Sequence, residues 1–168
     1  MWRTAIAAAG LLLAAVPAGA QAAGSCAGPA FRQFDFFAGD WDTYDMSDTM
    51  RVVARNRVTR ILGDCVLREA YEQNDGLVGE SYSLYDAGRR VWHQSWVTNR
   101  GGLLLLDGGL EGARMVLTGT EHRADGTSSL MRAIWWAEGP NVREKVERST
   151  DGGKTWVPVF DIVFRPHS

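Results

Sequence analysis

Charged side chains occur inside apolar, β-branched runs of this sequence, where they could contact a small molecule. In the run Val66–Gln73, Glu69 has the same parity as Tyr71, and further along Arg132 has the same parity as Trp136. Residues of equal parity lie on one face of a strand, and charges that face an interior must be paired. A Glu69–Arg132 pair is therefore one hypothesis for binding a polar ligand head, and Glu69 alone could act as an acid or base.

A second group of candidate side chains alternates along the run 91–98. Trp92, Gln94 and Trp96 share one face of this run. We predict that this face points inward, which would make Gln94 a polar anchor in an apolar pocket. The alternative is that one tryptophan lies in the core and the other covers the outer surface. The predicted ligand-binding residues are Trp41, Glu69, Tyr71, Tyr82, Trp92, Gln94, Trp96, Arg132 and Trp136.

Short strands must position these side chains. Runs rich in β-branched and aromatic residues alternate with tight turns such as Asn74-Asp75-Gly76, and tight turns force antiparallel neighbours. About ten such strands in series avoid exposed edges by closing into a barrel. The sequence thus predicts an all-β, antiparallel up-and-down barrel with a short helical turn over Phe31–Phe37 that caps one end. The predicted strands are 41–44, 51–61, 66–73, 79–85, 91–98, 103–107, 113–122, 128–137, 141–148 and 155–165.

Two local motifs support this architecture. Gly39-Asp40-Trp41 is typical of the start of a small barrel, in which the tryptophan plugs the bottom and the glycine lets the backbone pass beside it. The segment 149–156 matches an Asp-box hairpin, to which we assign a structural role. The predicted structural residues of the two motifs are Gly39, Trp41, Ser149, Asp151, Gly153, Thr155 and Trp156.

No common catalytic or metal-binding motif is present in the sequence. It lacks a Gly-x-Ser-x-Gly elbow, a His-Glu-x-x-His pair, a phosphate loop and a Cys-x-x-Cys pair. The histidines His93, His122 and His167 have no metal-ligand spacing. We therefore expect no catalytic residue, metal or cofactor. Haem is the alternative cofactor, with His167 as its ligand if the tail folds over the barrel mouth.

The N-terminal segment predicts export. Arg3 precedes an apolar run over 5–16, and Ala-x-Ala sites follow near Ala20. We assign residues 1–23 to a signal peptide and residues 24–168 to a single barrel domain, located in the periplasm or secreted, with no stable membrane insertion. The formal net charge is −2 and no long basic run occurs, which argues against a nucleic-acid partner. The oligomeric state stays open.

The sequence has two cysteines, Cys26 and Cys65. An even count in an exported chain favours a disulfide. A lipidated Cys26 and two free thiols are the alternatives.

Nearly the whole chain beyond the signal resembles a family of small exported bacterial proteins with a lipocalin-like (calycin) barrel and no assigned reaction. The segments that carry the resemblance are FDFFAGDWD at 34–42, GDCVLREAYEQNDGLVGESYSLYD at 63–86, VWHQSWV at 91–97, ERSTDGGKTW at 147–156 and FDIVFR at 160–165. The resemblance implies that Arg165 packs over Trp41 in a cation–π contact that closes one barrel end. It does not extend to a retinoid or fatty-acid ligand.

These observations favour a binding protein over an enzyme, with a small, mostly apolar molecule inside the barrel as its partner. One alternative is an enzyme that acts on a small hydrophobic substrate in the same cavity. The other is a solid barrel that binds a protein partner, which an exposed patch at Leu103–Leu106 would favour. We expect that segment instead to be buried on both sides.

Overall fold

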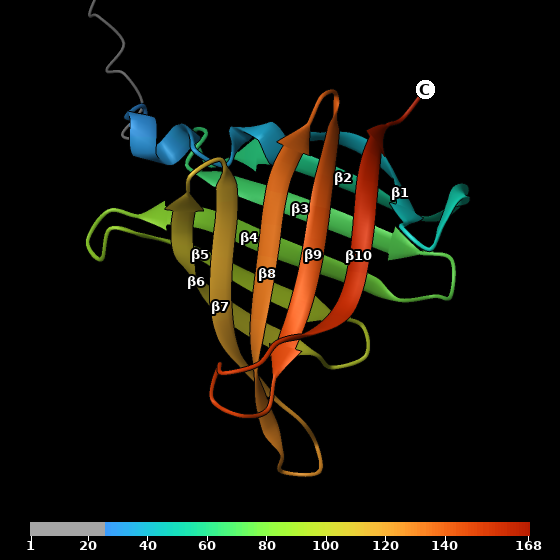
Figure 1. The fold of residues 1–168 in the computed structure, drawn as a ribbon. Coiled ribbons are helices and arrows are strands. Elements are labelled where there is room, and N and C mark those ends of the chain that lie inside the picture. The colour runs from blue at the N-terminus through green and yellow to red at the C-terminus, as the bar shows by residue number, and fades with distance from the viewer. Residues whose placement is uncertain (1–25) are drawn as a thin grey trace, which may run out of the picture.

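The computed structural model describes residues 26–168, so the predicted signal peptide lies outside the described residues. Ten strands form a closed barrel in which each strand pairs antiparallel with its neighbours in sequence and β1 pairs with β10 (Figure 1). The predicted fold class is therefore confirmed. The strands are β1 (Gly39–Asp45), β2 (Asp48–Ile61), β3 (Val66–Gln73), β4 (Val78–Asp86), β5 (Val91–Thr98), β6 (Leu103–Glu111), β7 (Arg114–His122), β8 (Ser128–Glu138), β9 (Asn141–Ser149) and β10 (Val157–Pro166).

Two 3-10 helices lie across one end of the barrel, η1 (Pro29–Arg32) and η2 (Asp35–Phe37) (Figure 1). Phe34, which lies between them, is fully buried, and Phe37 is 1% exposed. The Phe34 ring lies 5.3 Å from the ring of Trp135 and 5.7 Å from that of Trp92, edge-on to both. Phe37 packs 5.3 Å from Phe164. These aromatic side chains form a plug that closes this end, as the predicted helical turn required.

Gly39, at the start of β1, lets the Trp41 indole lie close against the backbone. A Cβ at Gly39 would collide with the Trp41 indole. That indole is 7% exposed, and its Nε1 donates a hydrogen bond to the Phe37 carbonyl at 3.0 Å. The tryptophan therefore joins β1 to η2.

The predicted contact between Arg165 and Trp41 does not form. Trp41 pairs with Pro166 across the β1–β10 ladder, and Arg165 pairs with Asp42. Because successive residues of a strand face opposite ways, Arg165 lies on the outer face while Trp41 points inward. The guanidinium stacks 4.3 Å from the Tyr44 ring and donates to the Thr49 carbonyl at 3.0 Å.

Cys26 and Cys65 form a disulfide that ties the arm before η1 to the turn between β2 and β3. The Cys26 sulfur is thus bonded within the chain, which disagrees with the lipidation alternative. A disulfide is typical of proteins in oxidising compartments. In the described part of the chain, no helix has the length and apolar character needed to cross a membrane.

Leu103–Leu106 is not buried on both sides. Leu104 and Leu106 face the barrel interior, whereas Leu103 and Leu105 are 58% and 49% exposed. The barrel is a single closed sheet, so the outer face of β6 has no second layer to cover it.

The Asp-box hairpin between β9 and β10 is held by its own side chains. Asp151 accepts hydrogen bonds from the backbone N–H groups of Lys154 and Thr155 at 3.0 and 2.9 Å, and from the Thr155 and Ser149 hydroxyls at 2.6 and 2.7 Å. These bonds lower the pKa of Asp151 to about 2. Gly153 has a φ of +89°, which a side chain resists.

Trp156 completes this hairpin. Its Nε1 donates to the Gly153 carbonyl at 3.1 Å, and the Arg132 guanidinium lies 4.2 Å from its ring centre. All of these contacts lie within the hairpin or on the outer wall, and a structural role for the Asp-box stays our prediction.

We expect Asp151→Asn to loosen the hairpin without unfolding the barrel, because the amide has only one oxygen to accept the four bonds. Amide hydrogen exchange at Lys154 and Thr155 should accelerate. Asp125→Asn is the matched control, since Asp125 holds the Thr127 amide and hydroxyl in another loop. Equal exchange in the two variants at Lys154 and Thr155 would contradict the assignment.

Candidate ligand cavity

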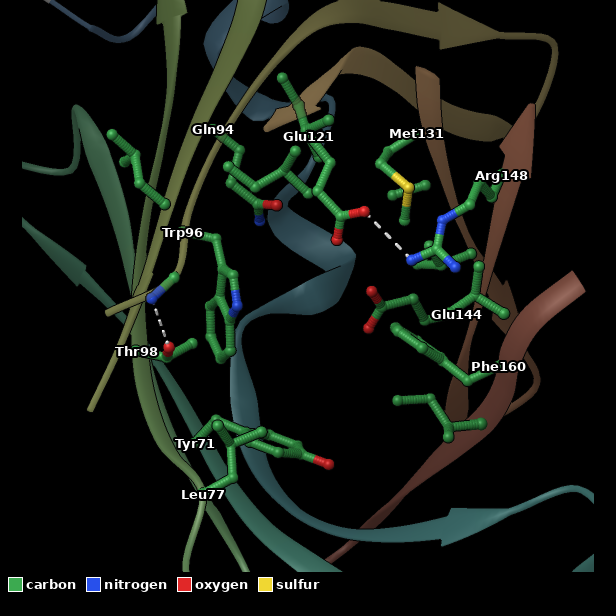
Figure 2. Close-up of a pocket in the computed structure, with 18 of the residues that line it drawn as sticks. Tyr71, Leu77, Gln94, Trp96, Thr98, Glu121, Met131, Glu144, Arg148 and Phe160 are labelled. Atoms are coloured by element: carbon green, nitrogen blue, oxygen red, sulfur yellow. Dashed lines mark hydrogen bonds and ion pairs between the residues drawn. The ribbon is translucent and has the colours of Figure 1, made fainter. Parts of the chain in front are cut away.

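A cavity of about 700 Å³ fills the barrel between the aromatic plug and the opposite end. Figure 2 shows the N-terminal helical segment behind the cavity, with side chains converging from the surrounding strands. Its apolar lining includes Leu104, Leu106, Met131, Val146, Phe160 and Ile162. The residues around its opening come from the turns after β1, β3, β5 and β7, which all lie at the end away from the plug.

A chain of buried polar side chains crosses four adjacent strands on the inner wall. The Asn56 Nδ2 donates to Glu69 Oε1 at 2.8 Å, and the Ser81 hydroxyl donates to Glu69 Oε2 at 2.7 Å. The Gln94 Nε2 donates to Ser83 at 3.0 Å and to Ser81 at 3.3 Å. All five residues are less than 9% exposed. Such a network fixes the orientation of Glu69 and Gln94 at the cavity wall.

Glu144 of β9 is the second carboxyl on the inner wall. It lies deep in the barrel, and its carboxyl points into the cavity (Figure 2). Burial raises its pKa well above the usual range, and the nearby Glu69 raises it further. The Trp135 indole N–H, which can donate toward Glu144, lowers the pKa of Glu144. The Trp135 Nε1 nevertheless makes no well-formed hydrogen bond within the described residues.

Glu69 shows the same direction of shift for the same main reason. Burial raises its pKa, and the hydrogen bonds from Ser81 and Asn56 reduce this increase. The two carboxyls therefore titrate as an interacting pair in one cavity.

Two aromatic rings form the wall opposite Glu144 (Figure 2). Tyr71 and Trp96 meet edge-on with ring centres 6.0 Å apart. Trp96 lies flat over Gly79, where a Cβ would collide with the indole. Burial raises the pKa of the Tyr71 phenol, so this group is neutral at ordinary pH.

An ion-pair cluster lies at the mouth of the cavity. Glu121 contacts Arg123 at 2.7 Å and Arg148 at 3.1 Å, and Arg123 also donates to Ser129 at 2.8 Å. The contact between Glu121 and Arg148 spans the upper part of the view in Figure 2. Both arginines of the cavity lining are thus bound to the same carboxylate.

Four of the predicted ligand-binding residues line the cavity: Glu69, Tyr71, Gln94 and Trp96. Trp41 and Trp92 point inward but belong to the aromatic plug, where Trp92 Nε1 donates to Gln33 at 3.0 Å. The inward face that we predicted for β5 is therefore present, but it divides between plug and cavity.

Tyr82, Arg132 and Trp136 lie outside the cavity lining. Tyr82 is 38% exposed and donates to Glu80 at 2.9 Å. The Trp136 ring has the guanidinium of Arg114 4.9 Å from its centre.

The predicted Glu69–Arg132 pair does not form. Arg132 Nε donates to Glu147 at 3.0 Å, whereas Glu69 is bound by Asn56 and Ser81. The inward face of β8 carries Met131, Ala133 and Trp135, which is the parity opposite to that of Arg132.

The histidines do not form a ligand set. His93 contacts Asp107 at 2.8 Å on the outer wall, and His167 contacts Asp42 at 3.0 Å. Because the His167 N–H donates to the Asp40 carbonyl at 2.9 Å, the tail lies beside the start of β1, at the plugged end, and does not cover the mouth. His122 lies in the cavity lining near the mouth. No group of three or more metal-ligating side chains occurs among residues 26–168.

Sequence reasoning did not identify Glu144 or Trp135 as cavity residues, although the sequence holds a signal for Glu144. Val142, Glu144 and Val146 share one parity, and both valines are buried. Met131, Ala133 and Trp135 also share one parity, but Ile134 and Trp136 on the other parity are equally apolar, so the sequence does not choose the inner face of that run.

The fold is a closed ten-stranded antiparallel barrel, consistent with a calycin-like fold, and its cavity is closed at one end and open at the other. No protein-family model matches the sequence, and a search of curated proteins finds no match.

We expect Glu144→Gln to stabilise the protein at neutral pH. A carboxyl with a raised pKa in the folded state binds a proton that the unfolded chain has released, so stability falls as pH rises through this interval. A glutamine does not titrate, so the variant does not lose stability as the pH rises. The free energies of unfolding of the two proteins should therefore become equal in acid, below the pKa of an unfolded glutamate. Urea unfolding across this pH range measures the difference.

Glu69→Gln is the comparison variant. In wild type, the two carboxylate oxygens of Glu69 accept hydrogen bonds from Asn56 and Ser81. A glutamine at this position has a single oxygen, so one of the two donors would lose its acceptor. It should therefore stabilise less than Glu144→Gln. A Glu144→Gln protein less stable than wild type at neutral pH would contradict the prediction.

Proposed function

We propose that this protein binds a small, mostly apolar molecule inside its barrel, in the periplasm or outside the cell. The observation that carries the proposal is the cavity of about 700 Å³ with its apolar and aromatic lining. Pockets for small ligands have volumes of roughly 300–1,000 Å³ and are lined mainly by hydrophobic side chains with a few oriented polar groups. The disulfide and the apparent export signal support an oxidising location.

The plug supports the proposal because it gives the cavity a floor. A solid barrel would be filled with side chains along its whole length, whereas here the buried aromatic rings cluster at one end. The opposite end is open, and its lining includes small residues such as Thr98 and Gly102 near the mouth.

Two adjacent positions on β6 provide the test. Leu104 lines the cavity, and Leu105 lies on the outer face at 49% exposure. Leu104→Trp should fill part of the cavity and weaken binding of the neutral apolar dye Nile red, measured by its fluorescence. Leu105→Trp adds the same side chain outside and should bind the dye as wild type does. Wild type that binds no dye, or equal loss in both variants, would refute an internal site.

A native mass spectrum of the protein purified from an oxidising compartment provides an independent check. A reproducible added mass that Leu104→Trp removes and Leu105→Trp keeps would identify the natural ligand's size. An absorption spectrum of the same sample tests for haem through its Soret band.

A second candidate function is an enzyme that acts on a small hydrophobic substrate. The specific observation in its favour is the pair of cavity carboxyls, Glu69 and Glu144, whose raised pKa values are typical of general acids. Chemical change of the bound molecule over time, abolished by Glu144→Gln or Glu69→Gln, would distinguish this candidate from binding alone.

A further inference from the structure

The inner wall of the cavity carries two carboxyl groups that form no ion pair among the described residues. Glu69 has neutral partners, Asn56 and Ser81. Glu144 makes no ion pair among the residues that the structure describes. The two arginines of the lining are both bound to Glu121 at the mouth. A cation that enters the cavity would therefore meet two carboxyls that no side chain already neutralises.

Glu144 has no evident structural role. Neighbouring inward positions of β9 are valines, Val142 and Val146, and a valine or leucine at 144 would continue this apolar wall. An isolated carboxyl in a protein interior is unfavourable unless it is paired or protonated. Its presence between two valines, on a strand face whose other polar residue is Arg148 at the mouth, points to an external partner.

Trp135, the cross-strand neighbour of Glu144, gives a second indication of an external partner. Its side chain is 2% exposed and lines the cavity, and its Nε1, which acts on the Glu144 carboxyl, makes no well-formed hydrogen bond within the described residues. Buried indole N–H groups usually have a partner. A ligand that carries an acceptor beside its charged group would satisfy this donor.

The aromatic wall fits a positive group as well. Tyr71 and Trp96 lie across the cavity from Glu144 (Figure 2), and an ammonium group is attracted to the faces of such rings. The rest of the lining, including Leu106, Met131 and Ile162, is apolar and suits a hydrocarbon body.

Resting on the proposed function, we propose that the ligand is an amphipathic organic cation, with a protonated amine held between Glu144 and Glu69 and an apolar body against the leucine and methionine wall. An anionic amphiphile such as a fatty acid would bring its charge close to two carboxyls and is disfavoured.

Binding of such a cation should strengthen as pH rises, because it requires the ionised carboxyls. The other ionisable groups of the cavity lining are Asp45, Tyr71, Glu121, His122, Arg123 and Arg148. Histidine is the side-chain type whose charge ordinarily changes near neutral pH, so His122 is the group that needs a control. A His122→Gln variant that keeps the pH dependence assigns it to the carboxyls.

The experiment compares three probes with one alkyl chain: decylammonium, decanol and decanoate. Isothermal titration at about pH 7.5 should show wild type binding decylammonium about tenfold more tightly than decanol, as hydrogen bonds to charged groups predict, with decanoate weakest. Glu144→Gln should remove most of the preference for the amine and keep decanol binding. Glu72→Gln is the control on the outer wall, where Glu72 is exposed, and should behave as wild type.

The outcomes separate this inference from the proposed function. Decanol binding that equals or exceeds decylammonium binding would overturn the cation and leave the apolar site in place. Absence of binding by all three probes, together with absence of Nile red binding, would overturn both. An amine preference that Glu144→Gln and Glu72→Gln leave equally intact would also overturn the assignment, since the charge would then lie elsewhere.

Discussion

Phe34→Ala is expected to lower the free energy of unfolding by about 3–5 kcal/mol, the range for removing a fully buried phenylalanine from a core. Phe34 is 0% exposed and contacts the rings of Trp92, Trp135 and Phe37. The neighbouring rings of Trp92, Trp135 and Phe37 are themselves buried, so they have little freedom to move into the space left by Phe34. Urea unfolding followed by tryptophan fluorescence measures the loss.

Phe31→Ala is the matched control for this prediction. Phe31 is half-buried and meets Tyr85 edge-on at 5.2 Å, outside the fully buried cluster. Its loss should be markedly smaller. A similar effect of the two substitutions would mean that the plug is stabilised by its whole arm and that Phe34 has no special role.

The strands were predictable because their side chains follow a period of two between strong turn signals. The runs 66–73 and 91–98 agree with β3 and β5 at both ends. The largest difference is in β6, which continues through Gly108 and Gly109 to Glu111. Consecutive glycines indicate a turn locally, but here Gly108 and Gly109 pair with Leu117 and Val116 of β7.

The candidate site was only partly predictable, because parity gives two faces but does not say which is inner. On β3 and β5 the inner face also carried the large apolar side chains, and Glu69, Tyr71, Gln94 and Trp96 were placed correctly in the interior. On β8 both faces carry large apolar residues, as Ile134 and Trp135 illustrate.

The position of a side chain along the barrel axis was the second property that the sequence did not predict. Trp92 and Trp96 share a face, but only Trp96 reaches the cavity, because the arm with Phe34 fills the other end. How deeply an N-terminal arm inserts depends on contacts between residues far apart in sequence, which strand periodicity does not describe.

Replacing Cys26 and Cys65 together by serine is expected to lower the free energy of unfolding by about 2–4 kcal/mol, the usual range for a disulfide that closes a loop of this kind. The two residues are 39 apart in sequence, and the closed loop contains η1, η2, β1 and β2. Without the bond the unfolded chain gains conformational freedom, while the folded barrel keeps its ladder. Urea unfolding under non-reducing conditions gives the comparison.

The disulfide and Phe34 hold the same arm by different means, so their effects should not be independent. With the bond intact, an arm that lacks Phe34 stays beside the barrel end. With both removed, the arm loses its tether and its main buried side chain, and it should undock before the barrel unfolds. Trypsin should then cleave the triple variant near Arg32 under native conditions, and cleave either parent variant far more slowly. Equally slow cleavage of all three proteins would contradict this expectation. It would show that the contacts of Phe37 and Trp41 are enough to hold the plug in place.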